Sequence, residues 1–151
     1  MKIEKLTVEG LTGAQLEQMV QIERSCGLEP YPRELLLHCV ADMETYGALD
    51  NGVLAGFLTV LPDGGYAEGT AYVVNLNVAQ EYRRQGIARQ LLCTVFASFP
   101  PETPIFLDVQ KNNAPARALY SGLGFRDTEL KSCNGKTDVV MVASASALRE
   151  T

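Results

Sequence analysis

Residues 72–96, YVVNLNVAQEYRRQGIARQLLCTVF, restrict the possible folds of this chain more than any other stretch. Residues 72–78 predict a buried strand, and a short turn carrying Arg83 and Arg84 follows. Beyond the turn, apolar residues recur at i, i+3, i+4, i+7, i+8 and i+11, the spacing of one face of an α-helix. These residues are Ala88, Leu91, Leu92, Val95, Phe96 and Phe99. We therefore expect this helix to pack on a sheet that contains the strand.

The N-terminus of this helix is a candidate site for an anion such as phosphate. The first N–H groups of a helix have no partner within the helix, and the helix dipole adds partial positive charge there. Arg83 and Arg84 would add charge-assisted hydrogen bonds, and Gly86 and Ala88 would let a ligand approach the backbone. The spacing alone equally allows an ordinary helix start with two solvated arginines.

Length and charge narrow the classes of protein and of partner. With 151 residues, 46% of them hydrophobic, the chain is long enough for one compact core, so we expect a single domain over residues 1–151. The net charge of −5 argues against a general nucleic-acid binder, because Lys and Arg supply most of the affinity for phosphate backbones. An amine substrate is compatible with this charge.

Neither a membrane anchor nor a metal site is expected. No apolar stretch approaches the roughly 18 residues that span a membrane, and residues 1–10 lack the apolar core of a signal peptide, so we expect a cytoplasmic protein with no membrane partner. The cysteines have no C-x-x-C spacing and His38 is the sole histidine, which leaves zinc without its usual ligands. The four cysteines, expected to be reduced thiols, are Cys26, Cys39, Cys93 and Cys133.

The order of elements predicts an α/β protein of the α+β type. Asn-Gly at residues 51–52, between two apolar runs, is a strong hairpin signal. Asn113 is expected to cap a helix with Pro115 in its first turn. The expected elements are a strand (2–8), helices (14–26 and 32–44), three antiparallel strands (46–49, 53–61 and 69–78), a helix whose first turn holds Gly86 and Ala88, a strand (105–110) parallel to 73–78, a helix ending near 122 or 124, and two strands (125–130 and 138–143).

Two other phosphate-binding motifs are not present, because the sequence lacks glycines that they require. A P-loop requires G-x-x-x-x-G-K-[ST], and although Gly135, Lys136 and Thr137 fit its end, Leu130 stands where its first glycine is required. A dinucleotide fold requires G-x-G-x-x-G and an acidic residue about 20 positions later. Asp108 lies near that distance, but the glycine pattern is absent.

Two segments resemble the GNAT superfamily of acetyl-CoA-dependent N-acetyltransferases. RRQGIA at residues 83–88 resembles the family's [QR]-x-x-G-x-[GA] signature between a strand and a helix. NAPARALY followed by GLGF, at residues 113–125, resembles its N-x-x-A-x-x-L-Y-x-x-x-G-F segment. The resemblance implies the GNAT fold, a mixed and mostly antiparallel sheet of about seven strands with a splayed parallel pair and about four flanking helices. The order of elements matches that fold over nearly the whole chain.

The resemblance also implies which residues bind acetyl-CoA. Backbone groups of residues 76–78 would hold the pantetheine arm where the strands at 73–78 and 105–110 splay apart, and residues 83–89 would surround the pyrophosphate. Asn113 would be a further contact. The residues implied are Leu76, Asn77, Val78, Arg83, Arg84, Gln85, Gly86, Ile87, Ala88, Arg89 and Asn113.

Acetyl transfer from a thioester to an amine needs a neutral amine, a donor for the developing oxyanion and a proton for the leaving sulfur. Tyr120, at the tyrosine position of the second motif, is the candidate acid, although it could equally be a core aromatic. Asp108 and Glu68 are the candidate bases. Asn75 and Asn77 face one side of their strand and either pair structurally or point toward the acceptor.

Within the superfamily, the chain is most similar to the ribosomal-protein alanine acetyltransferases, through IER…PYPRELL, both motifs and DVVMV. It lacks their tryptophan after the position of Pro32 and the aromatic pair in the loop SCNGKTD. We expect a monomeric or homodimeric enzyme that acetylates a peptide N-terminus or a small amine by direct transfer, with acceptor choice at residues 28–33 and 132–137. The alternative is a non-catalytic acyl-CoA sensor on the same fold.

Overall fold

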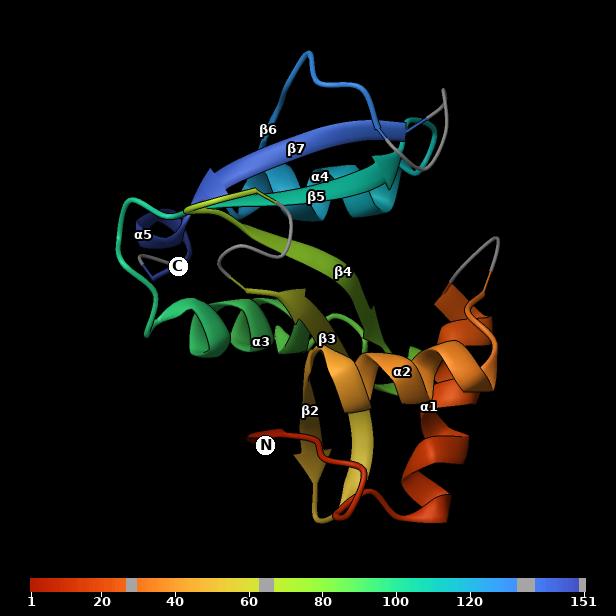
Figure 1. Ribbon diagram of the computed structural model, residues 1–151. Coiled ribbons are helices and arrows are strands. Elements are labelled where there is room, and N and C mark those ends of the chain that lie inside the picture. Colours follow the sequence, from red (N-terminus) through yellow and green to blue (C-terminus); the bar gives the residue numbers. More distant parts are fainter. Residues whose placement is uncertain (27–29, 63–66, 133–137, 150–151) are drawn as a thin grey trace. The chain divides into compact units, whose positions relative to one another are not determined.

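The computed structural model describes residues 1–26, 30–62, 67–132 and 138–149. They form two compact units, which are treated separately below: Met1–Val60 with Val74–Val95 (the first unit), and Leu61–Val73 with the described part of Phe96–Thr151 (the second unit). In the described chain, seven strands follow the order β1-β2-β3-β4-β5-β7-β6 with one parallel pair, β4 with β5, and there are five α-helices (Figure 1). The expected mixed, mostly antiparallel sheet is confirmed, with one helix more than expected.

The first unit contains the N-terminal strands and the helices that cover them. Antiparallel pairing joins β1 to β2 and β2 to β3, with a bulge between Ala48 and Leu49. The C-terminal part of β4 follows β3 in the sheet. The elements are β1 (Lys2–Lys5), α1 (Gly13–Cys26), α2 (Arg33–Asp42), β2 (Glu44–Asp50), β3 (Val53–Leu61), β4 (Ala71–Val78), the short 3-10 helix η1 (Gln80–Tyr82) and α3 (Ile87–Phe96).

Local signals explain how these elements begin and end. Thr12 and Gln15 form a reciprocal capping box before α1, in which each side-chain oxygen accepts from the other residue's backbone N–H at 3.0 and 3.1 Å. Asn51 and Gly52 both have positive φ, 50° and 84°, as a two-residue hairpin turn requires. The hairpin expected at residues 51–52 is therefore confirmed.

A buried cluster between α1, α2 and the strands holds the first unit together. Its fully buried members include Met19 on α1, Leu36 on α2 and Phe57 on β3. Gly56 on β3 permits a close approach to β4, since a Cβ there would lie 2.8 Å from the backbone oxygen of Asn77. The sheet thus fixes the backbone of β4 just before the candidate anion loop.

The second unit is built on β5 and β7, which pair antiparallel along their whole length. The first residues of β4 pair parallel with β5, from Ala71↔Ile105 to Val73↔Leu107, as the crossover rule predicts. α4 lies beside these strands (Figure 1). The remaining elements are β5 (Pro104–Gln110), α4 (Ala114–Gly122), β6 (Arg126–Asp127), β7 (Asp138–Ser144) and α5 (Ala145–Arg149).

Two expected strands are shorter than predicted. β1 ends at Lys5 because the chain turns at Thr7, whose side chain and carbonyl accept from Gly10 and Leu11. β6 ends at Asp127, since Thr128 directs both its N–H and its hydroxyl to the carbonyl of Val140. The Thr7 hydroxyl satisfies a backbone N–H of its own turn, whereas the Thr128 hydroxyl adds a second donor to a carbonyl on β7.

The sequence predicts no helix after the strand at 138–143 and a tail in the last few residues, but residues 145–149 form α5. Ala145 and Ser146 donate backbone hydrogen bonds to Thr103 and Pro101, and the side chains of Ala145 and Leu148 are fully buried. The alternating alanines and serines at residues 143–147 gave no helical period, so tertiary packing determines this helix. α3 also ends earlier than the apolar stripe predicts, and Phe99 packs edge-on against Phe96 at 4.9 Å. The glycines at 64–65 and 135 also predict turns at residues 63–65 and 134–135, and both lie outside the described residues.

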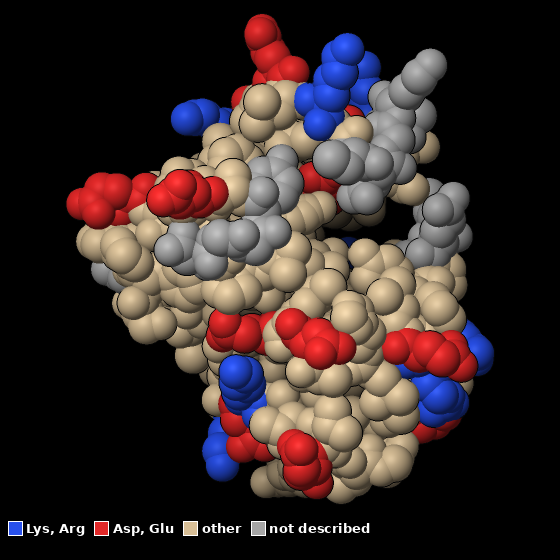
Figure 2. All heavy atoms as spheres, viewed as in Figure 1, with Lys and Arg blue, Asp and Glu red and all other residues tan. Residues whose placement is uncertain are grey.

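On the face shown in Figure 2, Lys and Arg side chains lie in small groups with acidic side chains near them, without a continuous basic patch over the described residues. Over the part of the chain with described coordinates, none of the helices has the length and apolar character to cross a membrane.

Candidate functional site

The loop that precedes α3 has the backbone geometry of an anion-binding turn. Arg84 and Gly86 both have positive φ, 64° and 77°. The first hydrogen bond of α3 runs from Gln90 N to Gly86 O, at 2.9 Å. The backbone N–H groups of Ile87, Ala88 and Arg89 have no hydrogen-bond partner among the described residues. Successive N–H groups left open at a helix start form a concave site for an anion.

Burial of one face of α3 holds this loop at the surface. Ile87, Leu91 and Leu92 are at most 4% exposed, so the helix axis is fixed by its apolar side. Arg84, Gln85 and the other residues before the helix are exposed. The apolar stripe predicted from the sequence is confirmed, and the open N–H groups lie at the N-terminal end of this helix, beside the exposed loop.

The loop arginines differ in how much of their hydrogen-bonding capacity is used within the protein. Arg83 donates to Val78 O at 3.3 Å, to Ser25 O at 3.4 Å and to Cys26 Sγ at 3.3 Å, so it ties the loop to the end of α1. Arg84 and Arg89 are exposed and make no ion pair or hydrogen bond with any described residue. They are the guanidinium groups available to an anion, whereas Arg83 has a structural role as well.

The end of β4 leads into this loop and is half-buried from Val74 to Val78. Val78 O accepts from both Cys26 Sγ, at 3.4 Å, and Arg83 Nε. Asn77 donates through Nδ2 to Glu23 Oε1 at 2.7 Å, so this side chain has a partner within the first unit. Asn75 differs, because both polar atoms of its amide are buried and unpaired among the described residues.

Glu23 is a functional candidate that the sequence reasoning missed. It lies on α1 with 6% exposure and accepts from Asn77 and from the backbone N–H of Tyr31. The available signal was its spacing, because Glu23 falls four residues after Met19 and three before Cys26, on the apolar face of α1. A charged residue in such a row is rarely buried without partners.

In the second unit, the second motif forms the capped helix that the sequence predicts. Asn113 Oδ1 accepts from Ala116 N at 3.3 Å, which confirms the N-cap. The half-buried Tyr120 packs edge-on against Phe125, with ring centroids 5.7 Å apart. Its carbonyl accepts from the N–H groups of Leu123 and Phe125. The motif therefore fixes the position of the tyrosine from both its backbone and its ring.

The two candidate bases have different surroundings. Asp108 is half-buried on β5, and Ser132 Oγ donates a hydrogen bond to its Oδ2. Glu68 is exposed in the turn before β4. A half-buried carboxylate with a hydrogen-bond donor is more constrained in direction than an exposed one, so Asp108 has the more defined geometry.

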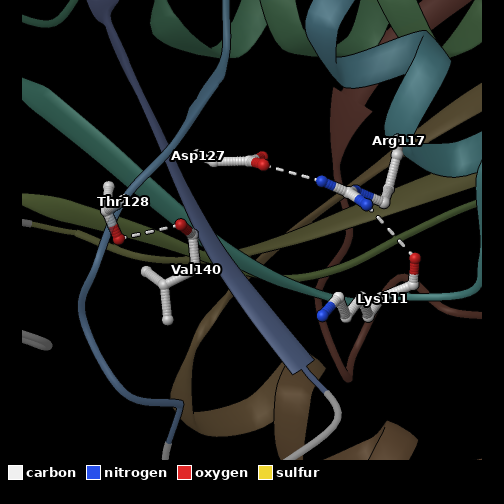
Figure 3. A network of polar contacts seen from close by, with 5 residues as sticks. All are labelled: Lys111, Arg117, Asp127, Thr128 and Val140. Carbon is white, nitrogen blue, oxygen red and sulfur yellow. Dashed lines mark hydrogen bonds and ion pairs between the residues drawn. The ribbon is translucent and has the colours of Figure 1, made fainter.

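Arg117, in the same motif, uses its guanidinium to hold the second unit together (Figure 3). Its Nη2 lies 2.7 Å from Asp127 Oδ2 on β6, and its Nη1 donates to Lys111 O at 3.3 Å. Arg117 Nε is buried without a partner among the described residues. This arginine connects α4 to both flanking segments and leaves little capacity for an external anion.

Two surface hollows lie among the described residues. One hollow, in the second unit, lies between Gly69 and the segment from Phe99 to Pro104. Another lies in the first unit beside Met1, Gln15 and Asp50. None of the described residues that line these two hollows is a candidate site residue. Among the described residues no cluster of three His, Cys, Asp or Glu side chains is placed to hold a metal ion.

Comparison with known proteins supports the resemblance found in the two motifs. A model of the Acetyltransferase (GNAT) family matches residues 16–125. The Uncharacterized N-acetyltransferase YkwB of Bacillus subtilis is 27% identical over 125 residues; the match covers 63% of this chain and 55% of that protein. The chain thus spans about half the length of this curated relative.

Solved structures share the fold over nearly the whole chain. The ribosomal-protein-S18-alanine N-acetyltransferase from Escherichia coli superposes with a TM-score of 0.75 at 23% identity, covering 96% of this chain and 94% of that one. The PaiA N-acetyltransferase from Thermoplasma acidophilum, solved in complex with coenzyme A, gives a TM-score of 0.73 at 20% identity, covering 95% and 99%. With the family model matching well over half of its residues, this chain belongs to the GNAT family of acetyltransferases.

Proposed function

We propose that the chain transfers the acetyl group of acetyl-CoA to a primary amine by direct attack, and that its acceptor is the α-amine of a peptide. The observation that carries the donor assignment is the loop before α3. It combines positive φ at Arg84 and Gly86, three N–H groups without described partners at residues 87–89, and two exposed arginines. A pyrophosphate supplies the acceptor oxygens and negative charge that these groups lack.

The residues around the loop have distinct roles in this proposal. The N–H groups of Ile87, Ala88 and Arg89 bind phosphate oxygens, and the guanidinium groups of Arg84 and Arg89 neutralise their charge. Arg83 and Gln85 support the loop, since both already donate to backbone carbonyls of the first unit. Backbone groups of Leu76 to Val78 hold the pantetheine arm. Asn113 contributes through whatever capacity remains beyond its N-cap bond.

Bound acetyl-CoA supplies the acetyl group as a thioester. Tyr120 donates a proton to the sulfur as the bond between carbon and sulfur breaks, and Asp108 accepts a proton from the attacking amine as the new bond between carbon and nitrogen forms. Glu68 is the alternative base. The thiol leaving group has an ordinary pKa of about 8.5, so it needs only modest help from an acid.

A peptide α-amine fits the proposed chemistry better than a lysine side chain. Its ordinary pKa is near 8, against about 10.4 for the lysine ε-amine, so a single carboxylate suffices to obtain the neutral form. The structural relative named for the alanine of a ribosomal protein supports the same class of acceptor. The free thiols of Cys26, Cys39 and Cys93 suit the reducing cytoplasm that we propose as its location.

A two-stage experiment tests the proposal. Thermal unfolding is first measured with acetyl-CoA, CoA, ATP and NAD. We expect acetyl-CoA and CoA to raise the melting temperature, and ATP and NAD to leave it unchanged. Stabilisation by ATP or NAD without acetyl-CoA would overturn the donor assignment. Release of free thiol is then followed with octapeptides that differ only in their first residue and with small diamines.

We expect turnover with at least one peptide, that with N-terminal alanine first. Turnover confined to diamines would show that the acceptor is a small amine and not a peptide α-amine. Binding of acetyl-CoA without turnover of any amine would support a non-catalytic acyl-CoA sensor instead. An octapeptide with an acetylated N-terminus is the matched control, because it keeps the sequence and removes only the amine.

A further inference from the structure

The carboxylate of Glu23 is buried among apolar residues, where a charged group is unfavourable unless it has specific partners. Glu23 is in the last turn of α1 and is 6% exposed, between core residues such as Met19 and the half-buried Cys26. Removing a carboxylate from water is strongly unfavourable unless hydrogen bonds compensate for the lost hydration. An apolar side chain at this position would pack without that cost.

Both carboxylate oxygens have partners, and these partners come from outside α1. Asn77 Nδ2 donates to Oε1 at 2.7 Å, across 54 positions of the sequence. The backbone N–H of Tyr31 donates to Oε2 at 3.0 Å. Both donors are oriented toward an acceptor-only group, the form a carboxylate takes when ionised, and such bonds are about twice as strong as neutral ones.

These two bonds connect the segments to which the proposed function gives different tasks. Asn77 belongs to the end of β4, proposed to hold the acetyl donor. Tyr31 lies in the connection before α2, where the sequence predicts that the acceptor is chosen. The Tyr31 side chain also packs against the core cluster of the first unit, so its backbone is held from two sides. One carboxylate therefore sets the spacing between residue 31 and the strand.

We propose that Glu23 is a positioning residue for the acetyl acceptor, fixing Tyr31 and its neighbours relative to β4. The inference rests on the proposed function and adds the residue through which the acceptor-selecting connection is held. Glu23 touches neither donor nor acceptor. Its loss should therefore change the KM for a peptide acceptor and kcat while leaving the affinity for acetyl-CoA nearly constant.

An exchange of the two side chains tests this directly. Asn77→Asp places a second carboxylate against Glu23 and should raise the KM for the alanine octapeptide at least about tenfold, because the bond becomes a repulsion. Glu23→Ala should have a similar effect, since it removes the acceptor of both bonds. In the double variant Glu23→Gln with Asn77→Asp, the new amide at position 23 donates to the new carboxylate at position 77 and accepts from Tyr31 N–H. We expect this variant to recover a KM within about threefold of the wild type.

The control is Thr45→Val, which removes one hydroxyl of the buried Thr45–Thr59 pair, 3.0 Å apart on β2 and β3 of the same unit. It should lower thermal stability by an amount comparable to the single variants without changing either KM. If all destabilised variants raised the KM alike, or if the exchange failed to rescue, the positioning role would be wrong. If Glu23→Ala weakened acetyl-CoA binding as much as it raised the KM for the peptide, the assignment to the acceptor would be wrong.

The proposed function fails by a different result. If the wild-type protein does not bind acetyl-CoA, or binds it without turnover, the proposed enzymatic function is wrong. The hydrogen bonds of Glu23 to Asn77 and Tyr31 are not contradicted by that result. In that event, hydrogen exchange of the Tyr31 amide provides the second readout. It should be fast in Glu23→Ala and slow in the exchanged double variant, and equal rates in both would overturn the link itself.

Discussion

The two motifs that identify the family use their polar groups in opposite ways. In the loop before α3, Arg84 and Arg89 and the N–H groups of residues 87–89 have no partners among the described residues. In the second motif, Asn113 caps α4 and Arg117 pairs with Asp127. The first motif has open hydrogen-bonding capacity, and the second uses most of its capacity within its own unit.

This difference separates ligand binding from positioning. Groups without partners in the protein gain the full strength of a charge-assisted bond when an anion arrives. Groups already paired gain little, because binding would only exchange one partner for another. Tyr120 is the exception within the second motif, since the motif fixes its ring and backbone while the proposed function makes its hydroxyl the proton donor. Substitutions in each motif should therefore change different measured quantities.

The largest effect is expected for Tyr120→Phe. The substitution keeps the ring that packs against Phe125 and removes the proposed proton donor, so kcat should fall about 10²- to 10⁴-fold while the Kd for acetyl-CoA changes by less than about twofold. Steady-state thiol release and calorimetric binding measure the two quantities. Leu119→Ala, at the exposed position before it, is the control and should keep kcat. Unchanged turnover in Tyr120→Phe would make this tyrosine a core aromatic, as the sequence allowed.

The next effect distinguishes the open arginines from the paired one. The double variant Arg84→Ala with Arg89→Ala should bind acetyl-CoA about 10- to 100-fold more weakly, since it loses two charge-assisted contacts to the pyrophosphate. The melting temperature of the free protein should hardly change, because both side chains are exposed and lack described partners. The salt dependence of the Kd should also become less steep. Equal affinity in the variant would remove the loop as the anion site.

The elements of this fold that can be predicted from the sequence differ from the others in whether their determinants are local or long-range. The hairpin at Asn51–Gly52, the cap at Asn113 and the buried face of α3 each depend on residues close in sequence, and all three were predicted. α5 and the early end of β6 depend on contacts with Thr103 and Val140, far along the chain, and both were missed. Local patterns determine element type, whereas tertiary hydrogen bonds determine where elements end.

The site shows the same limit. Glu23 was overlooked because its partners, Asn77 and the N–H of Tyr31, become neighbours only through packing of α1 on the strands. Arg83 matched the signature as well as Arg84 did, yet its bonds to Ser25 and Val78 give it a structural role that spacing cannot reveal. A motif identifies which residues meet a ligand as a group, and the structure separates those with open capacity from those without.

A smaller effect is expected at Gly86, where backbone conformation rather than charge is at stake. Gly86 has a φ of 77°, and no atom lies within 4 Å of the position that a Cβ would take, so Gly86→Ala meets no steric clash but strains the turn. We expect the Kd for acetyl-CoA to rise about three- to tenfold, matching a strain of about 1 kcal/mol that the loop relieves by moving its N–H groups. Gly52→Ala, with a φ of 84° at the hairpin, provides the same strain away from the loop. Equal effects of both variants on the Kd would assign the loss to general destabilisation.

The smallest effect is expected for Arg117→Ala. This variant is informative because the Kd for acetyl-CoA should stay constant while the stability falls slightly. The side chains of Arg117 and Asp127 are 31% and 52% exposed, so the ion pair is screened and should contribute only about 0.5–1 kcal/mol to the free energy of unfolding. Chemical denaturation of the variant should show a loss of that size, and Asp127→Asn should show the same loss if the pair is its source. The Kd for acetyl-CoA should stay within about twofold in both variants, because a guanidinium already bound to Asp127 and Lys111 has little left to offer a phosphate. A marked loss of affinity in Arg117→Ala but not in Asp127→Asn would show that the second motif also binds the anion, and the contrast between the two motifs would then fail.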